Sequence, residues 1–134
     1  MGQLDISRIE PLDEDSGVVV NLTDLHGVPL DVTITVAGTY SRRFRDAQHR
    51  LATSEPVRPR SSLEQINATA LALEAACIVA WDFVDGGAPL PITPDVWSQI
   101  AAQRPNWREQ VQSAMVDHAC HFDAARQRAK EEVS

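Results

Sequence analysis

The residues best able to do chemistry lie close together near the C-terminus of the chain. His118, Cys120 and His121 carry nitrogen and sulfur donors of the kind that bind Zn²⁺, and Asp123 follows shortly after. A structural zinc site needs four ligands, and the sequence has no second CxxC or HxxxH pair to complete one. Cys77 would have to be brought in by packing alone. We therefore expect no metal site, with His118 at the edge of the core and His121 in solvent.

A catalytic interpretation of the same cluster meets a geometric difficulty. Cys120 with His118 and Asp123 would form a nucleophile, base and acid on one helix. Such groups must converge on a substrate pocket, and neighbours on one helix rarely do so. The sequence also lacks a GxSxG elbow, a phosphate-binding glycine loop and a dinucleotide fingerprint. The sequence therefore predicts a protein that is not an enzyme and uses no cofactor.

Composition limits the possible partners. The 134 residues have a formal net charge of −7, which argues against nonspecific nucleic-acid binding over the whole surface. The apolar run from Ala68 to Ala80 is interrupted by Glu74 and is too short to span a bilayer. The N-terminal residues do not form a signal-peptide pattern, and two isolated cysteines fit a reducing compartment. We expect neither nucleic acid nor membrane as a partner.

The first part of the chain predicts a short β-hairpin. Residues 1–15 are acidic, and we expect them to be a poorly ordered lead-in. Val18–Leu22 is a strand candidate with Val18, Val20 and Leu22 on one face, and Asp31–Val36 alternates apolar and polar residues, as half-buried strands do. We therefore place a hairpin at 16–37. Two strands alone are marginal in water, so this hairpin must lean on helices or on a partner's sheet.

The rest of the chain predicts helices. Ser41 can cap a helix that runs to about residue 51, and residues 53–62 are expected to form an exposed loop. Gly86 and Gly87 are expected to end the longest helix. Three further helices are expected, at Leu63–Val84, Pro94–Arg104 and Asn106–Lys130. The predicted fold is mainly α, in the α+β class: an N-terminal hairpin followed by a bundle of about four helices, in a single domain at 16–130.

Two groups of residues are candidates for binding a partner. One is the basic set on the helix after Ser41, formed by Arg42, Arg43, Arg45 and Arg50. The simpler interpretation is that these arginines form a solvated helix face. The functional interpretation is that they form a docking surface for an acidic partner, which could be another copy of this acidic chain.

The other group consists of tryptophans at helix ends, Trp81, Trp97 and Trp107. Packing at the corner between helices is the simpler interpretation of all three. In the sharper interpretation one of them, with Trp81 and Trp97 as candidates, is partly exposed as an interface anchor.

Two stretches together resemble the tail assembly chaperone family of long-tailed bacteriophages. The first is Val36–Phe44 (VAGTYSRRF), which is similar to the family's strand, glycine and serine-capped helix. The second is Ala80–Val96 (AWDFVDGGAPLPITPDV), which is similar to its tryptophan, acidic-glycine turn, prolines and Thr-capped helix. Phe122 also matches by position. The resemblance covers roughly Leu12 to Ala125.

This resemblance implies a function that involves no bond-making. Such proteins bind the long helical tape measure protein in the host bacterial cytoplasm and keep it soluble while the major tail tube protein polymerises around it. They are absent from the mature virion. The opposite charges of residues 42–60 and the rest of the chain would also suit self-association into rings or spirals. A structural tail or head–tail joining protein of the virion is the alternative.

Overall fold

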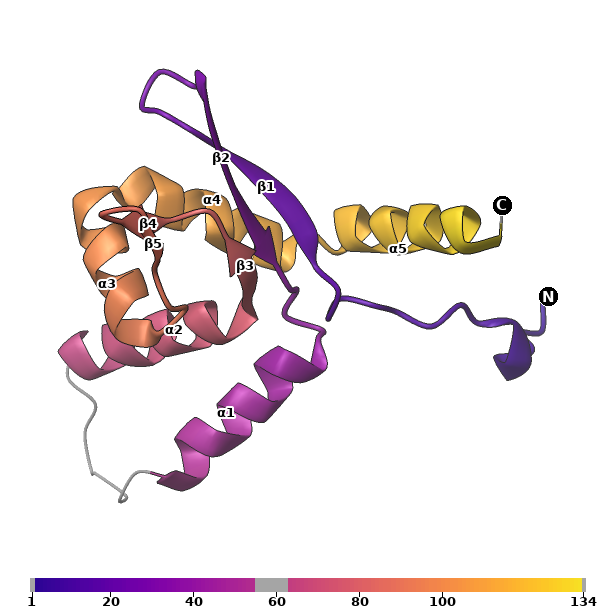
Figure 1. Cartoon of the computed structure of the whole chain (residues 1–134). Helices are drawn as coiled ribbons and strands as arrows, with labels where there is room; N and C mark the ends of the chain where they lie inside the picture. Colours follow the sequence, from indigo (N-terminus) through magenta and orange to yellow (C-terminus); the bar gives the residue numbers. More distant parts are fainter. Residues whose placement is uncertain (1, 55–62, 134) are drawn as a thin grey trace.

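The computed structural model describes residues 2–54 and 63–133, and these form a mixed α+β fold (Figure 1). The strands are β1 (Val18–Thr23), β2 (Pro29–Val36), β3 (Ile78–Trp81), β4 (Val84–Asp85) and β5 (Ala88–Pro89). The helices are α1 (Arg42–Ser54), α2 (Leu63–Cys77), α3 (Pro94–Gln103), α4 (Pro105–Val116) and α5 (His118–Val133), with a 3₁₀ turn at Ile6–Arg8. The predicted loop at 53–62 lies, beyond Ser54, outside the described residues.

The predicted N-terminal hairpin is confirmed, and it leans on the helices as expected. β1 pairs antiparallel with β2, with Val18 opposite Val36. Leu22, Ile34 and Val36 have no exposed surface, because the inner face of this hairpin packs into the core. The alternation of apolar and polar residues was therefore a reliable guide to the second strand.

The prediction of the longest helix, at Leu63–Val84, is wrong for its last turns. α2 ends at Cys77, and the next residues form β3, which pairs with β2 so that the sheet order is β1-β2-β3. Ile34 lies opposite Trp81, and the backbone N–H of Ala37 donates to the carbonyl of Cys77 at 2.7 Å. The free edge of β2 offers hydrogen bonds, and the β-branched pair at 78–79 favours a strand. Tertiary pairing therefore overrides the helical spacing at this point.

Gly86 and Gly87 form a hairpin turn and do not end a helix. Both have positive φ, at 59° and 87°, and they connect β4 to β5. Two consecutive residues with positive φ are what the tight turn of a two-residue hairpin requires, and glycine supplies them at little cost. The small hairpin is held against the body by Trp81, whose indole Nε1 donates to the carbonyl of Leu90 at 2.9 Å.

The helices that follow were predicted in part. α3 begins as expected, because the hydroxyl of Thr93 accepts from the N–H of Val96. The helix expected from Asn106 begins one residue earlier, because α4 starts at Pro105. The single helix expected over 106–130 is broken at Asp117, whose carboxylate accepts from the N–H of Cys120 and caps α5.

The core lies between one face of the sheet and helices α2, α3 and α4. Twelve buried residues form it within the described chain, among them Leu71, Trp97 and Val111. α1 has α2 as its main neighbour, and α5 extends from the body beside the N-terminal segment (Figure 1). The expectation of a hairpin followed by a four-helix bundle is therefore wrong: a third strand from the middle of the chain joins the hairpin, and not all helices pack together.

The end of the predicted lead-in is bound to the domain. The side chain of Glu14 is buried, and its carboxylate accepts from the N–H of Tyr40 at 3.0 Å. The carboxylate of Asp15 accepts from the N–H groups of Arg42 and Arg43 and so caps α1. These contacts tie residues 14–15 to the start of α1, although the sequence placed them in a poorly ordered segment.

No helix within the described ranges has the length and apolarity that crossing a bilayer requires.

Candidate functional site

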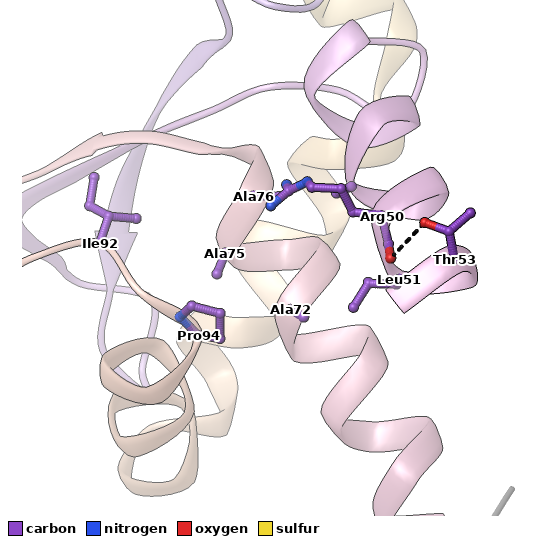
Figure 2. Close-up of a pocket in the computed structure, with 9 residues that line it drawn as sticks. Arg50, Leu51, Thr53, Ala72, Ala75, Ala76, Ile92 and Pro94 are labelled. Carbon is purple, nitrogen blue, oxygen red and sulfur yellow. Dashed lines mark hydrogen bonds between the residues drawn. The ribbon is translucent and has the colours of Figure 1, made fainter. Parts of the chain in front are cut away.

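An apolar groove runs between α1 and α2. Figure 2 shows α2 as its floor, α1 as one wall, and the link before α3 as the other. The hollow has a volume of about 540 Å³ and is lined by Ala47, Arg50, Leu51, Thr53, Ala72, Ala75, Ala76, Ile92 and Pro94. A second hollow of about 540 Å³ continues it toward the start of α1, since the two share four residues. Together the two hollows are called the α1/α2 groove below.

The groove exists because small side chains line the facing surfaces of the two helices. Ala47 on α1 and Ala75 on α2 are buried, and α1 and α2 are in contact. Ala72 and Ala76 keep part of their surface exposed, and no larger side chain of residues 2–54 or 63–133 fills the space above them. An alanine floor lets the backbone of another segment come close, as small residues do where helices pack tightly.

The rim of the groove carries two of the arginines that the sequence singled out. Arg50 extends from α1 across the groove toward Ala76 (Figure 2), and Arg43 lines the adjoining hollow together with Asp46. Both guanidinium groups are exposed, and neither is paired with a carboxylate of the described residues. Arg42 and Arg45 are exposed as well, but neither lines the groove, so the predicted basic set is split between faces of α1.

The tryptophans pack as a corner, as the simpler interpretation predicted. Trp81 is half-buried and lies 6.4 Å from Trp97, measured between ring centroids. Trp107 stacks on Phe83 at 5.7 Å. Trp97 has no exposed surface, so it is corrected from a candidate contact residue to a core residue. The reason is its place on the inner face of α3, where it meets the core.

His118 is held in a buried contact with the N-terminal segment. Its Nδ1 lies 2.8 Å from a carboxylate oxygen of Glu14, and its ring stacks on Tyr40 at 3.6 Å between centroids. About a third of its side chain remains exposed, at 30%, which places it at the edge of the core as predicted. These contacts join the lead-in, the turn before α1 and the start of α5, so His118 has a structural role here.

His121 is buried, so its predicted place in solvent is wrong. Its Nε2 lies 2.9 Å from the carbonyl oxygen of Ala114, and its Nδ1 has no hydrogen-bond partner among the described residues. The helix break at Asp117 allows the imidazole of His121 to lie against the last turn of α4, at Ala114. Within the described ranges, no three His, Cys, Asp or Glu side chains lie close enough together to hold a metal ion.

The two cysteines differ sharply in exposure, and a thiol assay should separate them. Burial raises the pKa of the Cys77 thiol to about 11, whereas Cys120 is exposed. Because the thiolate is the reactive form, we expect a disulfide reagent at pH 8 to modify Cys120 rapidly in the folded protein and Cys77 only after unfolding. Mass spectrometry of the modified peptides measures this. Equal rates for both thiols in the folded protein would contradict the buried position of Cys77.

Comparison of the chain with protein-family models, with curated proteins and with solved structures found no match. The described residues thus define an α+β protein with a small central sheet and a lateral groove that is apolar at its floor and basic at its rim. A surface of this kind can bind another chain by burying apolar side chains.

The sequence indicated the arginines of the site but missed its floor. Ala72, Ala75 and Ala76 lie in the helix predicted at Leu63–Val84, but none of them was predicted to line a binding surface. The available signal was the density of alanine in α2, which predicts a helix that another helix can approach closely. It did not show that one side of this helix would be left without a neighbour.

Proposed function

We propose that this protein is a tail assembly chaperone of a long-tailed bacteriophage and that it binds the tape measure protein. The single observation that carries the proposal is the α1/α2 groove. Its lining residues on α1 run from Arg43 to Thr53, which is about 15 Å of helix, and its floor of Ala72, Ala75 and Ala76 is apolar. A groove of this kind can accept the apolar face of an amphipathic helix from another chain.

The same proposal covers the setting and the other partners. The chaperone works in the host bacterial cytoplasm, brings the tape measure protein to the major tail tube protein, and makes no covalent bond. Copies of it can associate through the contrast between the basic α1 and the acidic remainder of the chain, whose net charge is −7. Many weakly binding copies along one client would hold it by avidity and still release it when tube subunits compete.

Co-expression tests the proposal directly. The tape measure protein of the phage that encodes this chain is expressed in bacteria alone and together with this chain. We expect the soluble fraction of the tape measure protein to rise several-fold in the second case and the two proteins to copurify. A tape measure protein that stays insoluble in both cases would contradict the proposal.

The matched variant for this test is Ala76→Glu, which places a carboxylate on the exposed part of the groove floor. We expect this variant to fold, because Ala76 keeps exposed surface, and to lose most of the gain in tape measure protein solubility.

The alternative function, a structural protein of the virion, makes a different prediction for purified phage. Stoichiometric presence of this chain in mature tails would favour a tail or head–tail joining protein.

A further inference from the structure

We propose that the client segment of the α1/α2 groove is an amphipathic α-helix with carboxylates seven residues apart, which pair with Arg43 and Arg50. This inference rests on the proposed function, because it names the chemistry of the segment that the groove receives. The occupant contributes a stripe of apolar side chains to the floor and its acidic edge to the rim.

The spacing of the two arginines sets the spacing of the acidic residues. Arg43 and Arg50 are seven positions apart on α1, which is close to two helical turns, or about 10.5 Å along the axis. They therefore lie on one face of α1, and both line the groove. A client helix that runs beside α1 repeats with the same period, so carboxylates seven positions apart on it meet both guanidinium groups.

The floor determines the apolar part of the client. Ala72 and Ala76 are one turn apart on α2, and their short side chains leave room for side chains of the incoming helix. Leu51 and Ile92 stand on opposite walls and would contact that helix from both sides. A strand would alternate its side chains toward and away from the floor, whereas a helix with an apolar stripe presents them all to it.

The charges around the groove favour an acidic segment. Arg43 and Arg50 are exposed and make no ion pair with the part of the chain that the structure describes, and Asp46 is the one acidic side chain among the lining residues. The rim is therefore net positive, in a chain whose total charge is −7. An acidic client is repelled by most of the surface and attracted here, which directs it to this site.

A second copy of this chain fits the rim less well. Among the described helices, none carries two carboxylates seven positions apart, so no helix of a second copy would pair with both arginines at once. The client's own sequence can repeat this pattern along a long helix. The partner is therefore a different chain with an acidic, heptad-spaced edge.

Two designed peptides test this chemistry. Each is a helix of about 20 residues with one leucine stripe, and they differ only in two edge positions, seven residues apart, which are Glu in one peptide and Lys in the other. Their binding to the full chain is measured by fluorescence anisotropy at about 50 mM and about 500 mM salt. We expect the Glu peptide to bind about tenfold more tightly at low salt and to lose most of this advantage at high salt.

Paired charge reversals assign the effect to the groove. Arg43→Glu/Arg50→Glu should reverse the preference, so that the Lys peptide binds more tightly. Arg42→Glu/Arg45→Glu makes the same change in net charge on other faces of α1 and should keep the wild-type preference. All four arginines are exposed, so both variants should fold, which circular dichroism checks.

Several results would overturn the inference. The two peptides could bind the wild-type chain equally well, or neither could bind it. The two double variants could change peptide binding equally, or they could change only the self-association of the chain. The co-expression test separates this inference from the proposed function. If Arg43→Glu/Arg50→Glu still keeps the tape measure protein soluble, the acidic spacing is wrong and the chaperone proposal stands. If the wild-type chain does not keep it soluble, the proposed function itself fails.

Discussion

Replacing Glu74 with alanine should lower the free energy of unfolding by about 3 to 5 kcal/mol, the usual cost of removing one partner from a buried ion pair. Only 4% of the Glu74 side chain is exposed, and Arg108 binds its carboxylate through Nε at 2.8 Å and Nη2 at 2.9 Å. Gln112 and the indole of Trp97 donate to the same carboxylate. Alanine would leave the buried indole N–H of Trp97 without an acceptor and would remove the carboxylate that joins Arg108 on α4 to α2.

Chemical denaturation followed by circular dichroism measures this loss. The matched control is Glu109→Ala on α4, which removes an exposed carboxylate and should change the unfolding free energy by less than about 0.5 kcal/mol. Glu74→Gln should fall between the two, because an amide keeps one acceptor oxygen for the donors. A loss below about 1 kcal/mol for Glu74→Ala would mean that α2 and α4 are not joined as the structure has them.

Replacing Trp97 with alanine should lower the unfolding free energy by a similar amount, about 3 to 5 kcal/mol, because it removes the largest fully buried side chain among the described residues. The indole contacts the aromatic corner at Trp81, and its Nε1 donates to Glu74 at 2.9 Å. Both the apolar volume and the hydrogen bond are lost together. Thermal and denaturant unfolding measure the result.

A second variant divides this loss into its parts. Trp97→Phe keeps most of the apolar volume and removes the N–H donor, so we expect a smaller loss than with alanine. Val116→Ala shortens a side chain that is 60% exposed and serves as the control, with little change in stability. If Trp97→Ala kept wild-type stability and weakened client binding, Trp97 would be an interface anchor and its buried position would be wrong.

Local patterns in the sequence predicted those elements that depend mainly on neighbouring residues. The alternation in Asp31–Val36 gave the second strand of the hairpin, and Thr93 before Pro94 gave the start of α3. These signals succeeded because side-chain period and capping act over a few positions. The prediction for the end of α2 failed because the pairing of β3 with β2 joins residues more than 40 positions apart.

The site was predictable only in its charges. Arg43 and Arg50 stand out because basic residues gather there in an acidic chain, and helical geometry alone places them on one face. The groove itself depends on which side of α2 the rest of the chain leaves uncovered, and that follows from the tertiary packing of α1 and of the link at Ile92. In the same way, the burial of His121 follows from a helix break at Asp117 that the periodicity does not show.

Site-directed photocrosslinking in the presence of the tape measure protein tests the central claim most directly, because it asks whether the α1/α2 groove touches the client. A photoreactive phenylalanine analogue replaces Thr53, an exposed residue of the groove wall, or Gln127, an exposed residue of α5 that serves as the control. The account predicts a crosslink to the tape measure protein from position 53 and none from position 127. A crosslink from position 127 with none from position 53 would contradict it.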